Sequence, residues 1–411
     1  MINKLVLIIK PKPIVKHNNL QKRYCILERY NSDYLESSKE LFYEVPIGIE
    51  LADYDDCDNY LIAILFEAMS EKRDIIIEGS VSKQLLINAK EYIECWVKWL
   101  PNALNIVDIK AQEVRFKGPK NSNCLSAYSG GVDATFSIWK SYKNKNRKDS
   151  YNITTCAFIH GVDIPLEDDY SFNQAFKSAK NTLSELSVSL IPIKTNFRLI
   201  NKFNWEYTHA CGIISSLSVL KKNFGKCIIG SSDPYDALIL PWGSNPITDH
   251  LLSSYDFKII HDGASHNRIE KSSYILDWKN GVKNLRVCWE GDHKGTNCGI
   301  CEKCLRTNVI FQMLNKDSKP DNFSNLRLLE NIKTLNFRST VLKSEWRQII
   351  NYAKLNNSLD SKIINQIKRK LRKPINQILF PIHSKRRILL KGIINGNKYS
   401  LFSQQKKTQI N

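Results

Sequence analysis

The sequence has no apolar run long enough to cross a membrane, because no stretch approaches the ~20 apolar residues that a spanning helix needs. Near the start, the apolar run from Leu5 to Ile9 is interrupted by Lys10 and Pro11 and is too short for the core of a signal peptide. We therefore expect no membrane partner and a cytoplasmic location. In that compartment the 11 cysteines would be thiols or metal ligands rather than disulfides.

Acidic residues are missing from the last part of the chain. No Asp or Glu follows Asp360, whereas 13 lysines and arginines do, so the first 360 residues carry only +6 of the net charge of +19. A basic tail without acids favours RNA, DNA or an acidic surface as partner. The alternative is a solvated tail without a specific partner, because Lys and Asn are abundant throughout the chain.

The sequence also lacks internal repeats, which excludes a solenoid. With 42% hydrophobic residues among 411, it predicts a globular protein with more than one core. Residues 1–120 are predicted to form an α+β accessory domain without recognisable chemistry, with strands over 5–9, 41–51, 74–78 and 105–116 and helices over 60–69 and 81–100. Residues 316–411 are predicted to form a helical, basic C-terminal extension, with helices over 345–355 and 359–370 and breaks at Pro374 and Pro381.

Between residues 121 and 315 the pattern alternates between apolar strands and amphipathic helices. This alternation predicts an α/β fold with a Rossmann-like parallel sheet and helices on both faces. Three of the predicted strands end in polar segments, at 129–133, 160–163 and 230–233. Because the carboxyl ends of parallel strands meet at one edge of a sheet, we expect these segments to share one site.

The first of these segments is the glycine loop, Ser129-Gly130-Gly131-Val132-Asp133, which lies between a predicted strand and a predicted helix. Two glycines permit a tight turn, and a helix start directs free N–H groups and the positive end of the helix dipole to one point. The loop therefore predicts an anion site. It is not the Gly-x-x-x-x-Gly-Lys-Ser/Thr phosphate loop, because no Lys follows at that spacing.

Four cysteines in the segment 286–306 predict a metal site. Their spacing is Cys288-x9-Cys298-x2-Cys301-x2-Cys304, which allows four thiolates to close on one tetrahedral ion. Four sulfurs without an open position favour structural Zn²⁺. An iron–sulfur cluster is the alternative, since it also takes four cysteines.

Together, the glycine loop and the downstream cysteines resemble the 7-cyano-7-deazaguanine synthases, members of the PP-loop ATP pyrophosphatase superfamily, between Cys124 and Leu314. The chain looks like an extended form, as found in bacterial defence operons and other specialised gene clusters. The resemblance implies that the four cysteines hold zinc and that ATP and Mg²⁺ are used. It implies that pyrophosphate is bound by Ser129, Gly130, Gly131, Val132, Asp133, Ala134 and Thr135, with Ser129 and Asp133 as catalytic residues. The family usually has Ser where this chain has Ala134, which removes one phosphate donor unless Thr135 replaces it.

The resemblance also implies where a deazaguanine-type base would bind. Asp249 is suited to the N–H pair on a guanine edge, with an Asp that caps a local turn as the alternative. The further substrate-binding residues are predicted from the other strand ends: His160, Asp163, Ser231 and Asp233. His160, His209 and His250 are candidate proton carriers.

The implied function is an AMP-forming ligase that adenylates a carboxylate, such as 7-carboxy-7-deazaguanine, and transfers it to ammonia or an amine. The product would be an amide or a nitrile, and the amine could belong to a protein or a tRNA. Two alternatives stay open. One is a tRNA base-modifying enzyme that uses the basic tail, and the other is a non-catalytic nucleotide-binding scaffold or defence protein, which Ala134 favours. The sequence gives no oligomeric state.

Overall fold

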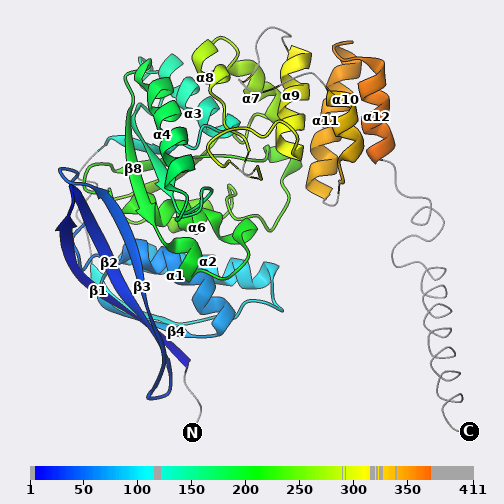
Figure 1. Cartoon of the computed structure of the whole chain (residues 1–411). Coiled ribbons are helices and arrows are strands. Elements are labelled where there is room, and N and C mark those ends of the chain that lie inside the picture. The colour runs from blue at the N-terminus through cyan, green and yellow to red at the C-terminus, as the bar shows by residue number, and fades with distance from the viewer. Residues whose placement is uncertain are drawn as a thin grey trace, which may run out of the picture.

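The computed structural model describes residues 5–114, 122–288, 290–291, 293–314, 320, 323, 327–337 and 340–371, without the side chains of residues 114, 340 and 341. These residues form an α/β protein in which helices pack against one large sheet and a further group of helices extends the molecule at its C-terminal side (Figure 1). The predicted breaks at Pro374 and Pro381 and most of the basic tail lie outside the described residues.

Ten strands form one sheet in the order β10-β9-β6-β7-β8-β3-β2-β1-β4-β5. Neighbouring strands are parallel except for the pairs β1–β2, β2–β3 and β3–β8. The bounds are β1 Leu5–His17, β2 Leu20–Asn31, β3 Tyr34–Pro46, β4 Asp74–Ser82, β5 Ile109–Val114, β6 Cys124–Ala127, β7 Ile153–His160, β8 Ser189–Thr195, β9 Lys226–Gly230 and β10 Lys258–Asp262.

The antiparallel part of the sheet differs from the sequence prediction, which missed β2 and placed β3 too late. Every second residue of β2 is buried, but the buried positions include Gln21, Arg23 and Arg29, so the strand shows no clean apolar alternation. Arg23 is tolerated inside because it donates to the Asp53 carbonyl (2.7 Å) and to Asn59 Oδ1 (3.1 Å). The sequence of β2 therefore lacks the alternation of apolar and polar residues by which a strand is predicted.

Helices cover both faces of the parallel part of the sheet. On one face lie α1 (Asp58–Glu71), α2 (Lys83–Trp99) and α6 (Trp205–Ser218), whose side chains share a core with Leu125 of β6 and Ala157 of β7. On the other face lie α3 (Val132–Lys143) and α4 (Asp169–Ser184), which pack with Cys124 and Cys156. Neighbouring strand residues thus point to opposite cores, as expected for a sheet buried on both sides.

The strand order contains a reversal at β6. From β6 the chain moves through β7 to β8 on one side, and after α6 it returns to form β9 and β10 on the other side. In open α/β sheets a crevice forms beyond the carboxyl ends of the two strands at such a reversal. Here those strands are β6 and β9, which end at the glycine loop and at Gly230, respectively.

Hydrogen bonding continues between the strands on either side of residue 120. Tyr43 and Glu44 of β3 lie opposite Thr195 and Lys194 of β8. The side chain of Asn196 extends this pairing, because it donates to the Glu40 carbonyl (2.7 Å) and accepts from the Phe42 amide (2.9 Å). The accessory strands and the strand–helix alternation thus share one sheet.

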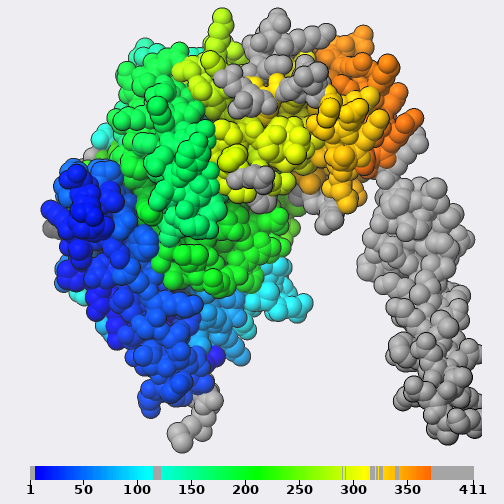
Figure 2. Space-filling view, viewed as in Figure 1, coloured from blue at the N-terminus to red at the C-terminus, as the bar shows by residue number. Residues whose placement is uncertain are grey.

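The short helix α5 (Phe197–Ile200) packs near β3, and α7 (Arg268–Tyr274) and α8 (Lys279–Lys283) pack near α3 and α4. The last helices are α9 Glu302–Leu314, α10 Leu328–Thr334, α11 Thr340–Leu355 and α12 Ser361–Leu371. The two helices predicted near the end are confirmed as α11 and α12. In Figure 2 the orange atoms of the last helices lie directly against the yellow atoms of α9, and Trp346 is fully buried between them. Among the described residues, no helix is long and apolar enough to span a bilayer.

A buried ion cluster ties α1, the end of α6 and the turn before β10 together. The ammonium of Lys221, only 3% exposed, lies 2.7 Å from Asp58 and 3.4 Å from Asp256, and it also pairs with Asp56. Burial raises the pKa of Asp58 to about 6, and Lys221 opposes that rise. Removing one partner of such a cluster leaves buried charge without compensation.

We expect Lys221→Met to lower the free energy of unfolding by about 3–5 kcal/mol, because three carboxylates then lose their counter-ion. The matched control is Lys222→Met, whose partners Glu50 and Asp53 are largely exposed. This control should cost less than about 1 kcal/mol. Equilibrium denaturation of the two variants measures the difference. Equal losses of unfolding free energy in the two variants would contradict the assignment of Lys221 to a buried ion cluster.

Candidate functional site: four cysteines and a glycine loop

The four cysteines of the segment 286–306 converge in the structure. The sulfur atoms of Cys288, Cys298, Cys301 and Cys304 all lie within 4.8 Å of one another. The Sγ–Sγ distances are 3.8 Å from Cys288 to Cys301 and 3.9 Å from Cys298 to Cys304. Tetrahedral zinc with Zn–S bonds of ~2.3 Å separates its sulfurs by ~3.8 Å. The cluster could therefore hold a metal such as zinc.

The local chain explains why the cysteines converge. Gly299 takes a positive φ of +74°, which lets the segment from Cys298 to Cys301 turn tightly, and the Cys301 amide donates to Cys298 Sγ (3.3 Å). Asn297 accepts from the Cys288 amide (3.3 Å) and donates to the Leu285 carbonyl (2.7 Å), so it holds the two parts of the segment together. A multi-iron cluster lies between its thiolates and would hold them farther apart than one ion does, so this geometry favours a single ion.

The glycine loop adopts the strand–turn–helix form that its sequence predicts. Gly130 has a φ of +80°, and Gly131 is the residue before α3, with no side chain capping the helix. The Thr135 amide donates to the Gly131 carbonyl (3.0 Å) as the first bond of the helix. The free backbone N–H groups in the first turn of α3 therefore have no capping side chain as hydrogen-bond acceptor.

The segment before Cys288 is in direct contact with this loop. The amide of Arg286 donates to the Gly130 carbonyl (2.8 Å), and its guanidinium donates to the carbonyls of Ser129 (3.3 Å) and Cys288 (3.3 Å). A Cβ added to Gly130 would lie 3.3 Å from Arg286 Cβ. The cysteine segment and the loop therefore support each other through one residue.

Asp133 is the charged centre of the loop. Its Oδ2 lies 3.1 Å from the Arg268 guanidinium, and its Oδ1 lies 3.1 Å from the ammonium of Lys271, both from α7. Burial acts to raise the pKa of Asp133, but the two cations outweigh it and the pKa is lowered. Asp133 is therefore ionised, and two basic side chains stand beside the glycine loop.

The end of β9 lies against the backbone of Asp133. A Cβ on Gly230 would lie only 3.0 Å from the Asp133 carbonyl, so a larger residue at this position would push the glycine loop away from β9. Ser231 is buried, its hydroxyl donates to the Asp233 carbonyl (2.7 Å), and its own carbonyl accepts from Lys271. Burial raises the pKa of Asp233, and Arg268 opposes this. The strand ends 129–133 and 230–233 thus meet at the reversal of strand order.

Three other residues predicted for the site, Thr135, Ala134 and His160, are buried or partly buried. Thr135 is fully buried, and Ala134 packs partly into the core beside Tyr128, so neither side chain is on the open side of the loop. His160 is buried, contacts the Pro165 carbonyl (2.8 Å) through Nε2, and stacks on Phe172. Burial lowers its pKa.

Asp163, by contrast, is exposed at the end of β7. It interacts electrostatically with Arg286, Lys303 and His209. Asp163 is therefore within electrostatic range of Arg286, the residue that contacts the glycine loop.

Asp249 is enclosed by the protein. It accepts from the Ser244 hydroxyl (2.6 Å) and from the Asn245 amide (3.0 Å), and it lies 2.8 Å from His261 Nδ1. The residue is only 1% exposed. In this structure Asp249 holds its local turn together and presents no oxygen to a ligand.

Sequence reasoning missed the basic residues of the site, Arg268, Lys271 and Arg286. Their position depends on tertiary contacts that bring α7 and the cysteine segment to β6. One signal was present: Arg268 and Lys271 are three positions apart and so lie on one helix face, and Arg286 directly precedes the cysteine pattern.

The chain has no match among protein-family models, curated proteins or solved structures. Its function is therefore argued from the geometry above and from the sequence resemblance.

We expect the purified protein to carry one zinc ion per chain, measured by elemental mass spectrometry. Cys301→Ser should lose most of this zinc and about 3 kcal/mol or more of unfolding free energy, because zinc binding supplies folding energy. The control Cys95→Ser changes a partly exposed cysteine of α2 outside the cluster and should retain the ion. Visible absorption with bound iron and sulfide, or wild-type zinc in Cys301→Ser, would contradict the assignment.

Proposed function

We propose that this protein is an ATP-dependent, AMP-forming ligase that activates a carboxylate and transfers it to ammonia or an amine. The observation that carries the proposal is the meeting of the glycine loop, the β9 end and the two cations of α7 where the strand order reverses. This arrangement places backbone N–H groups and positive charge around one point. It suits the pyrophosphate of ATP, whose charge increases as the bond between the α and β phosphates breaks.

In the proposed reaction a carboxylate oxygen attacks the α-phosphorus of ATP and pyrophosphate leaves. The amine nitrogen then attacks the acyl carbon, AMP leaves, and the amine loses a proton. The amides at Gly130 to Val132 would hold the departing pyrophosphate, with Arg268 and Lys271 neutralising its charge. Asp133 and Asp233 are the carboxylates available to Mg²⁺, whose chemistry is to neutralise phosphate charge. Both oxygens of Asp133 contact cations, so metal binding there would require those contacts to shift.

For the acceptor of the adenylyl group we propose a 7-deazaguanine carboxylate or a similar base, as the sequence resemblance implies. Asp163 is the better candidate for contact with the base than Asp249, because Asp163 is exposed and Asp249 is enclosed. The zinc would have a supporting role, since the four cysteines leave no open ligand position and act on the loop through Arg286.

A second candidate function is nucleotide binding without turnover. Both oxygens of Asp133 are held by Arg268 and Lys271, and Ala134 offers no hydroxyl at the helix start. Such a site could retain a nucleotide through its amides and cations while Asp133 stays paired with Arg268 and Lys271 instead of binding Mg²⁺.

The proposal predicts that the protein releases AMP and pyrophosphate when it is mixed with ATP, Mg²⁺, 7-carboxy-7-deazaguanine and ammonium. Asp133→Asn should lower this rate by about 10²-fold or more, because it removes a carboxylate that would hold Mg²⁺ at the reacting phosphates. Asp149→Asn is the matched control, since Asp149 is an exposed carboxylate in the loop after α3 that pairs with the exposed Arg147. Coupled assay of pyrophosphate with chromatography of the nucleotides measures both products.

Two results would reject catalysis. Binding of ATP without AMP release, with every carboxylate and amine tried, would favour the non-catalytic function. Equal rates for the wild type and Asp133→Asn would show that Asp133 of the glycine loop has no role in the reaction.

A further inference from the structure

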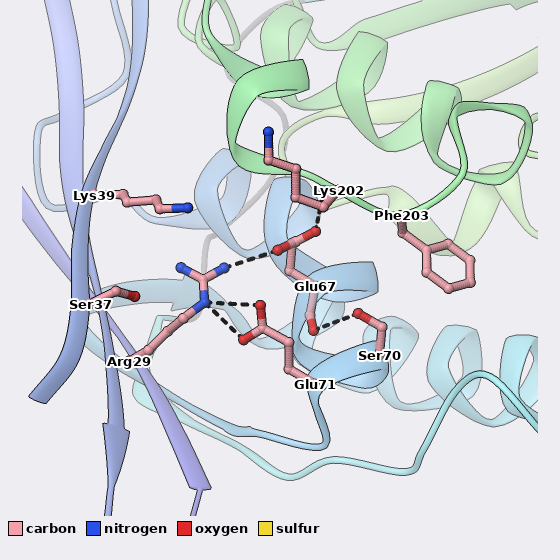
Figure 3. Close-up of a pocket in the computed structure, with 8 residues that line it drawn as sticks. All are labelled: Arg29, Ser37, Lys39, Glu67, Ser70, Glu71, Lys202 and Phe203. Atoms are coloured by element: carbon pink, nitrogen blue, oxygen red, sulfur yellow. Dashed lines mark hydrogen bonds and ion pairs between the residues drawn. The ribbon is translucent and has the colours of Figure 1, made fainter. Parts of the chain in front are cut away.

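A hollow of about 370 Å³ lies in the N-terminal half of the molecule, between the sheet and α1 (Figure 3). Its walls come from β2 and β3, from the end of α1 and from the turn after α5, and they share no residue with the glycine-loop site. This volume falls in the range of pockets that hold small molecules.

Arg29 forms the base of the hollow and has an unused donor. Its Nε contacts both oxygens of Glu71 (2.8 and 3.0 Å), and its Nη2 contacts Glu67 (3.0 Å). Its Nη1 is buried without a hydrogen-bond partner, in a residue that is only 7% exposed. In Figure 3 the terminal nitrogen without a dashed line is the one on the side of Lys39. A buried donor of this kind costs stability unless an acceptor occupies the space beside it.

Two lysines stand at the rim above Arg29. Lys39 extends from β3 toward the Arg29 guanidinium, and Lys202 lies on the opposite wall with its ammonium directed away from Arg29, so this flexible side chain would turn toward a ligand (Figure 3). Both are exposed, and within the described residues neither forms an ion pair, although other lysines of the same sheet, such as Lys10 and Lys22, do. Their charge is therefore available to a ligand.

The acids of the hollow are already engaged within the protein. Glu67 accepts from Arg29 and from the backbone amide of Lys202, and Glu71 accepts from Arg29 and from Arg73 (2.8 Å). The hollow therefore combines satisfied carboxylates with cations that have unused donors. This difference favours an anionic ligand over a cationic one.

We propose that this hollow binds a phosphorylated small molecule, with the phosphate between Arg29 Nη1, Lys39 and Lys202. Donors from three directions match the tetrahedral oxygens of a phosphate better than the planar pair of a carboxylate. The Ser37 hydroxyl offers a further donor on the same wall. The rest of the ligand would lie toward the ring of Phe203, which stacks on Phe66 with ring centres 5.5 Å apart.

The proposal is tested by isothermal titration of the full chain with inorganic phosphate and with ribose 5-phosphate. Neither probe is the nucleotide substrate of the proposed ligase reaction. The double variant Lys39→Gln, Lys202→Gln should weaken binding of both probes by about tenfold or more for each lysine, because each loses a charged hydrogen bond. Both lysines are exposed and have no ion-pair partner among the described residues, so the variant should fold normally. The matched control, Lys16→Gln, removes an exposed lysine of β1 and should bind as the wild type does.

Absence of binding by the wild type at millimolar probe would overturn the proposal, and so would unchanged binding by the double variant. The result is separable from the ligase proposal, because the double variant should release AMP and pyrophosphate at the wild-type rate if that activity exists.

Discussion

The contact between Arg286 and the glycine loop is the interaction on which the arrangement of the site depends. Through its backbone amide and its guanidinium, this one residue joins Ser129 and Gly130 to the carbonyl of Cys288. Burial lowers the pKa of Arg286, with Asp163 opposing the shift. A metal bound by the four cysteines would fix the segment that carries Arg286, and hence the shape of the loop. The cysteines can therefore influence chemistry at a point where they have no direct contact.

The charge balance around Asp133 sets what the loop can do. Arg268 and Lys271 approach from α7 and occupy both carboxylate oxygens, and Gly230 lets the end of β9 come close to the Asp133 backbone. Without an anionic ligand, Asp133 neutralises these cations. With a polyphosphate present, the same cations would have a second anion to contact, and Asp133 would become free for a metal. Ligand binding and the carboxylate would thus compete for two side chains.

Much of this arrangement follows from patterns that are local in the sequence. The alternation after Cys124 predicts the parallel strands, the two glycines predict the turn into α3, and the cysteine spacing predicts the convergence of four sulfurs. The rest depends on contacts between distant segments. Strand β2 was missed because it buries Gln21, Arg23 and Arg29, and Arg268 and Lys271 enter the site only because α7 packs against α3. Asp249 looked available in the sequence, but Ser244, Asn245 and His261 enclose it.

The most direct test of the central claim, that the glycine loop is an anion site at the reversal of strand order, is hydrogen exchange of its backbone amides. Exchange of the peptide containing residues 129–135 would be followed by mass spectrometry with and without pyrophosphate and Mg²⁺. We expect slower exchange in this peptide when pyrophosphate is bound, because the free amides at the start of α3 would then have an acceptor. Unchanged exchange at saturating pyrophosphate would contradict the assignment of the glycine loop as an anion site.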